Sequence, residues 1–460
     1  MTRDAAHVPP AERGPYPLRA GNAVRPLVDG EPAFRRICEA VENARTRVWV
    51  TVAFIERHVQ MPDGRGGFFD VLDRAAARGL DVRVIFWRSP ELEAVDPGSH
   101  FSGTAEERAW LAERGTRFHA RWDRAAKLYC QHQKSWLVDA SETGEIAFVG
   151  GINLQDSSVV APGHAPRDGH NVHDVYVEVR GPAATDVHHN FVQRWNESSE
   201  RGESDGLWPD ARSQDDLPFP SAISAEAGAV PVQIQRTVRR GLYANGHPTP
   251  GGEAFGIADG DYSIASQYLR AIDAAQRTIY FEDQAIGSVQ VIDGLRAALE
   301  RGVEVVFLAP IDPNTEMAAA RKSPESAAFF ESLGALGDFE HFTLAGIASN
   351  REGGGYQNVY VHAKICLVDD AWCTIGSTNI GNRSFYGDTE LNASFWHEPT
   401  VRSLRVELFQ EHLGRDTEAL SDREALQLFR EIASEGAALR AGGARLPAAA
   451  LKLDPTTYAS

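Results

Sequence analysis

Hydrophobic and polar positions follow two alternating patterns along this chain. In 68–79 (FFDVLDRAAARG) and 291–302 (VIDGLRAALERG) apolar residues recur every three to four positions up to a glycine, which is typical of amphipathic helices. Runs rich in β-branched and aromatic residues, such as 47–55 (RVWVTVAFI) and 277–286 (RTIYFEDQAI), are typical of buried strands. Because helices and strands alternate, the pattern predicts an α/β fold with layers around mixed sheets.

The chain also repeats itself. Segments of one half recur in the same order in the other, at an offset of about 230 residues: 78–87 (RGLDVRVIFW) with 301–310 (RGVEVVFLAP), 132–139 (HQKSWLVD) with 362–369 (HAKICLVD), and 150–153 (GGIN) with 376–379 (GSTN). A duplicated unit predicts two similar α/β/α sandwich halves with mixed β-sheets, related by pseudo-twofold symmetry.

The boundary between the halves falls in 203–224, which is rich in proline, serine and aspartate. We therefore predict four parts: an N-terminal extension over 1–24, a first half over 25–210, a second half over 225–415, and a helical C-terminal tail over 416–460 that frays at its end. The long loops 155–172 and 238–262 are interpreted either as functional rims or as simple surface insertions.

Composition narrows the function classes. With 460 residues, 43% of them hydrophobic and 24% charged, the chain has the balance of a globular protein of two ordinary domains. A net charge of −18 repels nucleic-acid backbones, so we expect no nucleic-acid partner. The start of the chain lacks the apolar core of a secretory signal, and no stretch reaches the ~20 apolar residues of a membrane span. We therefore expect a cytoplasmic protein.

The candidate chemistry lies in a string that occurs twice, His-x-Lys-x4-Asp followed by Gly-x-x-Asn. On a strand, residues i and i+2 share a face, so each histidine and lysine of 132–134 and 362–364 point the same way. Asp139 and Asp369 have the opposite parity and are assigned structural roles at the strand ends. A single His-x-Lys is a weak signal, but the doubled string favours an active site over two histidines that merely pack in a core.

Two imidazoles on opposite sides of a phosphorus atom can cleave a phosphodiester without a metal. One neutral ring attacks and forms a phosphohistidine, and the other protonates the leaving alcohol. Lysine charges and asparagine amides can stabilise the non-bridging oxygens. The residues predicted for this work are His132, Lys134, Asn153, His362, Lys364 and Asn379.

The doubled string resembles the paired signature of the phospholipase D superfamily, from about residue 25 to 415. Further segments, such as 171–196 (NVHDVYVEVRGPAATDVHHNFVQRWN) and 360–385 (YVHAKICLVDDAWCTIGSTNIGNRSF), resemble the catalytic core of eukaryotic-type members. The family's usual Glu-Asn-Gln segment here reads Glu282-Asp283-Gln284. We expect none of the lipid-binding domains that precede this core in many eukaryotic members, which leaves lipid docking and headgroup choice open.

The resemblance implies His132 as the nucleophile and His362 as the general acid and base, although the sequence alone is symmetric. It also implies that Asp174 and Glu390 fix the tautomers of the two histidines, with Asp388 as the competitor to Glu390 and ordinary strand-end acids as the alternative. The glycines of the repeat (Gly150, Gly151 and Gly376) are expected to allow close backbone approach to the phosphate, and Ser377 to offer a hydroxyl.

Other histidines are assigned simpler roles. We expect His188 and His189 on a helix surface, and we interpret His164, His170 and His173 as part of a loop rim in preference to a metal site. No metal and no cofactor are predicted.

The leading functional hypothesis is hydrolysis of a phospholipid, with transfer of the phosphatidyl group to other alcohols, by a monomer that contacts membrane surfaces transiently. A soluble phosphodiester, such as a glycerophosphodiester or a nucleotide, is the alternative substrate. A catalytically silent binding protein is the alternative from another class.

Overall fold

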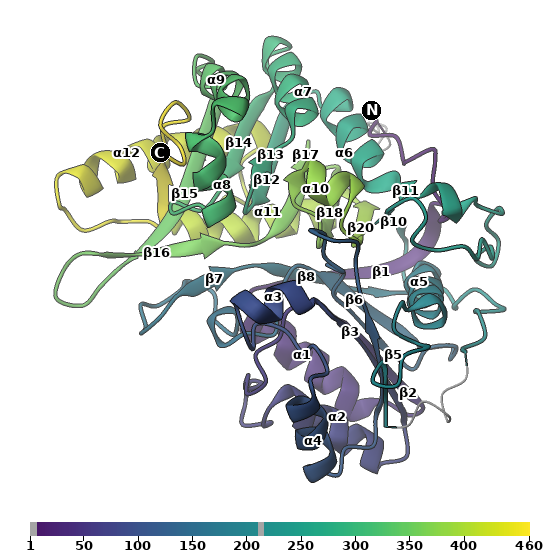
Figure 1. The fold of residues 1–460 in the computed structure, drawn as a ribbon. Helices are drawn as coiled ribbons and strands as arrows, with labels where there is room; N and C mark the ends of the chain where they lie inside the picture. The colour runs from purple at the N-terminus through teal and green to yellow at the C-terminus, as the bar shows by residue number, and fades with distance from the viewer. Residues whose placement is uncertain (1–6, 210–215) are drawn as a thin grey trace.

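Two β-sheets with the same strand order form the framework of the molecule (Figure 1). The computed structural model describes residues 7–209 and 216–460. The N-terminal sheet runs in the order β1 (Arg19–Val28), β8 (Val175–Arg180), β6 (Ile146–Gly150), β5 (Ser135–Val138), β2 (Arg47–Val52), β3 (Asp81–Trp87) and β4 (His119–Asp123). The C-terminal sheet runs in the order β10 (Val230–Val238), β20 (Glu390–Trp396), β18 (Trp372–Gly376), β17 (Lys364–Val368), β12 (Thr278–Asp283), β14 (Glu304–Leu308) and β15 (Phe342–Asn350).

Both sheets are mixed in the same way. In each, three strands are parallel (β2, β3 and β4, or β12, β14 and β15) and the others pair antiparallel. The halves are joined because β1 pairs antiparallel with its counterpart β10, and because β7 (Asn171–His173) pairs parallel with β16 (Tyr356–Val361). The predicted duplicated α/β architecture with mixed sheets is therefore confirmed. Short strands complete the set: β9 (Leu207–Trp208), β11 (Asp261–Tyr262), β13 (Ile286–Gly287), β19 (Ile380–Gly381) and β21 (Ala450–Lys452).

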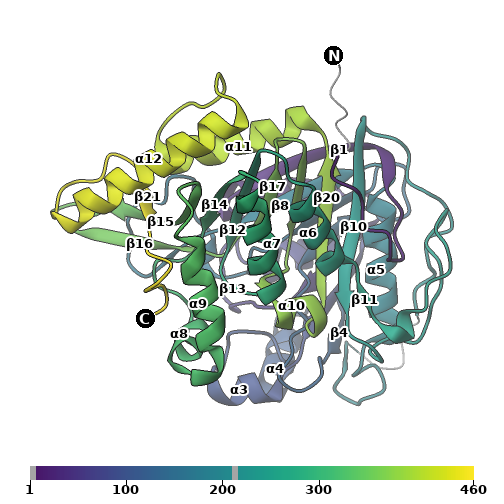
Figure 2. The same cartoon turned by 90° about the horizontal axis from the view of Figure 1, so that it is seen from above.

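Helices cover the outer face of each sheet (Figures 1 and 2). The N-terminal sheet carries α1 (Gly30–Asn43), α2 (Phe68–Ala77), α3 (Pro90–Val95) and α4 (Ala105–Glu113). The C-terminal sheet carries α6 (Ser263–Ala274), α7 (Val289–Glu300), α8 (Thr315–Lys322), α9 (Ala327–Leu336) and α10 (Asn382–Tyr386). Three further helices pack on the central core: α5 (Ala184–Glu197), α11 (Glu398–Leu413) and α12 (Asp422–Ala441).

Local sequence explains where α2 and α7, the corresponding helices of the two repeats, end. Gly79 follows α2 and Gly302 follows α7, and both have a positive φ, 85° and 84°. Glycine adopts this left-handed conformation without a steric cost. The glycine stops predicted from the sequence are thus confirmed at both positions of the repeat.

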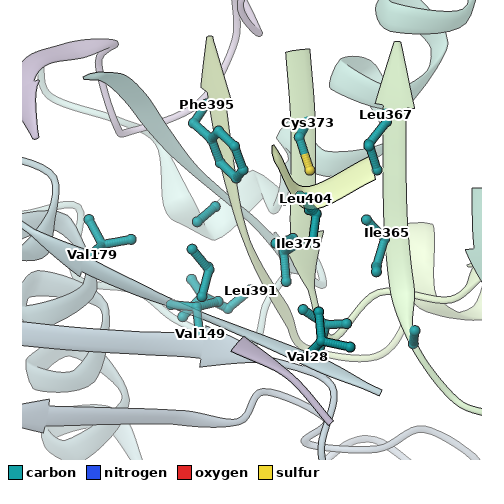
Figure 3. Packing of buried hydrophobic residues seen from close by; sticks show 14 of the residues in the cluster. Val28, Val149, Val179, Ile365, Leu367, Cys373, Ile375, Leu391, Phe395 and Leu404 are labelled. Carbon is teal, nitrogen blue, oxygen red and sulfur yellow. The ribbon is translucent and has the colours of Figure 1, made fainter. Parts of the chain in front are cut away.

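The inner faces of the two sheets share one hydrophobic core. Figure 3 shows Val149 and Val179 of the N-terminal half near Ile375 and Leu391 of the C-terminal half. All four side chains are buried. Because this core takes side chains from both halves, neither sheet buries its inner face alone.

The two ends of the chain differ from expectation. In the predicted extension over 1–24, Val8 and Tyr16 are buried and β1 already begins at Arg19. After α12, β21 pairs with β15 and Tyr458 is buried, so the predicted fraying of the C-terminus is wrong. The predicted boundary segment 203–224 lies partly outside the described residues.

Candidate active site

The two signature strings meet at one cavity of about 900 Å³. His132 lies shortly before β5 and His362 shortly before β17, the equivalent strands of the two sheets. Both histidines line the cavity, together with Asn153 and Asn379, each of which follows the next strand of its half. Four residues predicted from the doubled string therefore face one space.

Each histidine is held by a carboxylate from the opposite half. Nδ1 of His132 lies 3.0 Å from both carboxylate oxygens of Glu390, at the start of β20. Nδ1 of His362 lies 2.5 Å from Oδ2 of Asp174, which directly precedes β8. A carboxylate at Nδ1 fixes the ring and its tautomer, which leaves Nε2 as the nitrogen available to a substrate.

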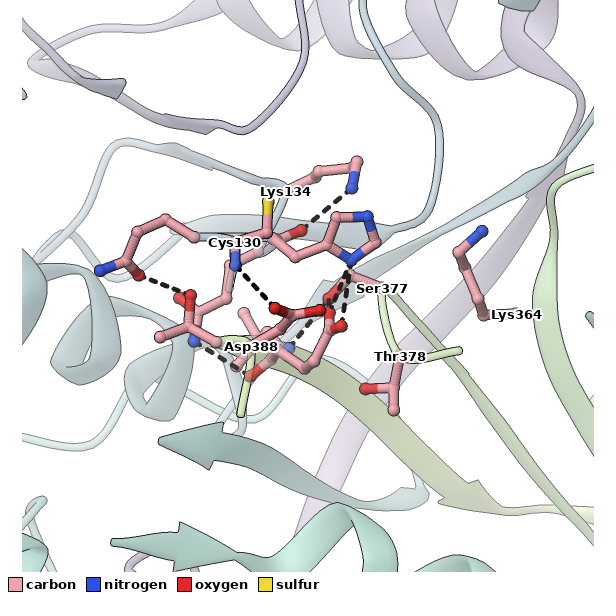
Figure 4. Close-up of polar contacts among 12 residues, drawn as sticks. Cys130, Lys134, Lys364, Ser377, Thr378 and Asp388 are labelled. Carbon is pink, nitrogen blue, oxygen red and sulfur yellow. Dashed lines mark hydrogen bonds and ion pairs between the residues drawn. The ribbon is translucent and has the colours of Figure 1, made fainter. Parts of the chain in front are cut away.

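Asp388 takes a different place from Glu390. Its carboxylate accepts from the backbone N–H of Cys130 and from the guanidinium of Arg383. Figure 4 shows the contact between Cys130 and Asp388. Asp388 lines the cavity without hydrogen bonding to His132, so Glu390 is the carboxylate that orients this ring.

The two lysines, labelled in Figure 4, are almost fully buried. Each ammonium donates to the backbone carbonyl of the histidine two residues earlier. The distance from Nζ of Lys134 to the carbonyl oxygen of His132 is 3.0 Å, and Lys364 makes the equivalent contact with His362. Burial lowers the pKa of Lys134 to about 8 and lowers the pKa of Lys364. Lys134 thus stays charged at neutral pH, and both ammonium groups lie in a region that disfavours charge.

Burial also sets the protonation of the paired groups. It lowers the pKa of both histidines well below the usual value, and the neighbouring lysines add to the effect. Burial raises the pKa of Asp174 and that of Glu390 to about 7. At neutral pH without substrate, both imidazoles are therefore neutral, which is the form that a nucleophile requires.

Ser377 and Gly151 occupy the same position of the repeat and support the carboxylates. The hydroxyl of Ser377 donates to Oε2 of Glu390 over 2.5 Å. A Cβ at Gly151 would collide with the carboxylate of Asp174 and the side chain of Lys364. In the structure Ser377 contacts, and Gly151 makes room for, a side chain that orients a histidine, and the expected roles of both residues toward a phosphate stay predictions.

Gly150 and Gly376, the other glycines of the repeat, also stand where a side chain would not fit. A Cβ at Gly376 would overlap the side chain of Asn392, and one at Gly150 would overlap the backbone of Val175. Packing between neighbouring strands is therefore one reason for these glycines, and their predicted close approach to a phosphate stays a prediction.

Asp139 and Asp369 lie at the far ends of β5 and β17. Asp139 accepts from the backbone N–H groups of 45–47, and Asp369 from those of 276–278. Each aspartate therefore ties the end of its strand to the start of the neighbouring strand, β2 or β12. Neither residue lines the cavity.

Sequence reasoning missed the apolar wall of the cavity. Phe54, Met317, Phe329 and Phe330 line it, the last three from α8 and α9. Their spacing on helices is the same as that of core residues, so no sequence signal separates them from the core. Gln284 and Arg383, which also line the cavity, stand in the segments that resemble the superfamily.

The remaining histidines are placed differently from expectation. His188 and His189 lie in α5 but are buried, so the prediction of a surface location is wrong. His164 and His173 are buried between the halves and do not form a rim. Of the three rim histidines, His170 is exposed.

Comparison with known proteins places this site in a family. One family model, described as phospholipase D, matches residues 165–299, and another, described as cardiolipin synthase, PLD-like domain, matches residues 268–412. Together they cover more than half of the chain. The chain belongs to the phospholipase D superfamily, as the doubled string indicates.

Two of the matching relatives are distant in sequence. The chain is 28% identical over 378 residues to cardiolipin synthase A of Pseudomonas entomophila, an alignment that covers 81% of this chain and 64% of that protein. It is 24% identical over 570 residues to phospholipase D alpha 2 of Oryza sativa subsp. japonica, covering 93% of this chain and 68% of that protein. The chain thus spans about two thirds of the length of these relatives.

The fold has a counterpart among solved structures. The phosphatidylserine synthase of Haemophilus influenzae superposes with a TM-score of 0.55 at 14% identity, covering 93% of this chain and 97% of that chain. This likeness confirms the fold. Within the described residues, no helix has both the length and the apolar character that crossing a membrane requires.

Proposed function

We propose that this protein is a phosphodiesterase that cleaves a phospholipid and transfers the phosphatidyl group to water or to another alcohol. One observation carries the proposal. Two histidines from separate halves line a single cavity, and each is oriented by a carboxylate of the other half. This arrangement supplies the two nitrogen bases that a double displacement at phosphorus needs.

In the first step, Nε2 of His132 attacks the phosphorus atom, and the bond between phosphorus and the leaving oxygen breaks. His362, protonated once the phosphodiester anion is bound, donates its proton to that oxygen, so the headgroup leaves as an alcohol and not as an alkoxide. In the second step, neutral His362 removes a proton from water or an alcohol, whose oxygen attacks the phosphohistidine and releases His132. The assignment of His132 as nucleophile rests on the resemblance to the superfamily.

Side chains that are already in place before the reaction can stabilise the negative charge on the phosphoryl oxygens. Lys134 and Lys364 supply positive charge, and preorganised donors of this kind contribute roughly 3–4 kcal/mol each in other enzymes. The Oδ1 atoms of Asn153 and Asn379 are buried and find no hydrogen-bond partner among the described residues. Their amides are therefore free to turn an N–H toward a bound phosphate.

The surface around the cavity supports a lipid substrate. Of the six large exposed hydrophobic residues of the described chain, four line the cavity or stand close in sequence to a residue that does: Val95 (79% exposed), Leu128 (81%), Val289 (49%) and Tyr386 (38%). Val289 itself lines the cavity, and the other three stand within two residues of a lining residue. Exposed apolar groups that surround a site are typical of contact with a lipid surface.

Phosphorus NMR tests the proposal directly. Phosphatidylcholine vesicles should yield phosphatidic acid, and added ethanol should divert product to phosphatidylethanol, because both acceptors share one covalent intermediate. His132→Ala and His362→Ala should each abolish both products, and a chelator should leave the initial rate of the native enzyme unchanged. Full activity in either variant would overturn the two-histidine mechanism.

A rim variant separates lipid from soluble substrates. Leu128→Ser should reduce the rate on vesicles several-fold and leave the rate on a monomeric short-chain phosphatidylcholine unchanged. Ile223→Ser is the matched control, because Ile223 is exposed to 46% but is not near the cavity lining. If Leu128→Ser leaves the rate on vesicles as unchanged as the rate on the monomeric substrate, or if activity is confined to glycerophosphodiesters, the soluble alternative is favoured.

A phosphohistidine trapped on the enzyme excludes a silent binding protein. We further propose that the enzyme acts as a monomer in the cytoplasm.

A further inference from the structure

A second cluster of titratable side chains lies behind the pair formed by Asp174 and His362. It consists of Asp29, His164, His173 and Glu411, here called the interfacial cluster. Asp29 lies between β1 and α1, His164 in the loop after β6, and His173 at the end of β7, whereas Glu411 belongs to α11 of the other half. The exposed fraction of these side chains is 6% or less.

The donor atoms of the cluster converge on one point. One ligand atom from each residue lies within 4.8 Å of all the others. Oδ1 of Asp29 is 2.9 Å from Nδ1 of His173 and 3.2 Å from Nε2 of His164, and Nδ1 of His173 is 4.0 Å from Oε2 of Glu411. Ligands bound tetrahedrally to zinc at ~2.0–2.1 Å lie roughly 3.3 Å apart, which is within this range.

Several of these atoms lack the hydrogen bonds that burial demands. Nε2 of His164, Oδ2 of Asp29 and Oε2 of Glu411 are buried without a hydrogen-bond partner among the described residues. Nε2 of His164 is close to Asp29, but the two do not form a hydrogen bond. Buried polar atoms are normally satisfied, so these three indicate a bound group that they share.

The surroundings of His173 fit a metal ligand. Its Nε2 lies 2.9 Å from Oε2 of Glu282, and the other oxygen of Glu282 is held by Tyr280 and His412. A carboxylate at one ring nitrogen fixes the proton there and leaves the lone pair of the other nitrogen for a metal. The lone pair of His173 Nδ1 is then directed into the interfacial cluster.

The cluster also needs positive charge. Asp29, Glu411 and Glu282 bring three buried carboxylates together, and buried carboxylates require a cation nearby. A set of two imidazole nitrogens and two carboxylate oxygens is typical of zinc. The competing source of charge is protonation of the histidines themselves.

We propose that the interfacial cluster binds one zinc ion as a structural site. The ion has no part in the reaction steps, and the inference does not depend on the proposed substrate. Zinc here would fasten the loop and strand that carry His164 and His173 to α11 of the other half. The backbone carbonyl of His173 accepts from the N–H groups of His362 and Ala363, so the site would also fix the frame of the active histidine.

Metal analysis of the purified full-length chain tests the proposal. Protein produced with zinc in the medium and passed through a column without chelator should contain about one zinc ion per chain. His164→Gln and Glu411→Gln should lose most of this zinc. His170→Gln is the matched control, since His170 lies in the same loop but is exposed, and it should keep the full content.

A refolding experiment covers the case in which the variants do not fold. Wild-type protein unfolded in guanidinium chloride and refolded with EDTA should show a thermal transition several degrees lower than protein refolded with zinc. Cobalt added in place of zinc should give the visible absorption of a tetrahedral site. Wild-type protein that contains no metal and refolds fully in EDTA would overturn the proposal and identify the cluster as a network of protonated histidines. None of these readouts uses phosphodiesterase activity, so they are independent of the proposed reaction.

Discussion

Glu390 orients His132 across the boundary between the halves, and its contribution can be measured by removing only its charge. Glu390→Gln keeps the size of the side chain but no longer fixes the tautomer of the ring. We expect kcat to fall by roughly 10³–10⁴-fold, as for the orienting carboxylate of a catalytic triad, with a much smaller change in KM. Steady-state kinetics on a monomeric substrate would show this split.

The control is another buried carboxylate that lies next to a histidine outside the cavity. Glu145 is 3.3 Å from His188. Glu145→Gln should lower thermal stability and leave kcat unchanged. An equal loss of kcat in both variants would mean that Glu390 acts only through folding.

The buried lysine of the first string should set the alkaline limit of activity. Burial lowers the pKa of Lys134 to about 8, so the ammonium is charged below this pH and neutral above it. If the charge stabilises the phosphoryl oxygens, kcat/KM should fall as pH rises through about 8. In Lys134→Arg the guanidinium stays charged, so the fall of kcat/KM at alkaline pH should move to higher pH even if the rate is reduced. A pH profile of kcat/KM for both proteins checks this, and an alkaline limb at the same pH in both would contradict it.

At the residue scale, the sequence and its resemblance point to the site residues and to the two orienting carboxylates, Asp174 and Glu390, but not to which histidine each carboxylate serves. The doubled string picks out His132 and His362 because the same pattern occurs twice. The pairing of each with a carboxylate of the other half depends on how the halves pack, which no local pattern records. The role of Ser377 is missed for the same reason, since its hydroxyl is used by Glu390.

At the scale of the elements, the aspartates at the ends of β5 and β17 have a structural role and not a catalytic one. Asp139 has a positive φ of 54°, which asparagine tolerates, and its carboxylate accepts from three successive backbone N–H groups. Asp139→Asn loses the charge that strengthens these bonds. We expect the free energy of unfolding to fall by about 1.5–3 kcal/mol with kcat unchanged. Urea denaturation followed beside kinetics checks this, and a loss of kcat at unchanged stability would place Asp139 in the reaction.

Helices with a strong amphipathic pattern can be predicted from the sequence, whereas short strands that form only by pairing with a strand far away in the chain cannot. The amphipathic patterns and their terminal glycines predict α2 and α7, because each pattern lies within the helix's own continuous stretch of sequence. By contrast, β7 exists through its pairing with β16, and β21 through its pairing with β15. Their residues carry no local strand signal strong enough to replace those partners.

For the whole molecule, duplication explains both the symmetry of the fold and the composition of the site. The counterpart strands β1 and β10 pair with each other at the centre, so the two sheets meet at the axis that relates them. A fold built in this way brings equivalent strands, β5 and β17, to one cavity. The offset of the repeats predicts the duplication, but the central pairing is visible only in the structure.

This architecture predicts that the two halves are active only together. Fragments 1–209 and 216–460 each contain one histidine and the carboxylate that serves the other. Each fragment alone should be inactive, and co-expression should restore activity through the shared core and the pairing of β1 with β10. A co-expressed pair in which only the first fragment carries His132→Ala should stay inactive although the complex forms, as gel filtration would show. Activity in either isolated fragment would mean that a half can complete the site with a second copy of itself, and the cross-paired site would then not be required.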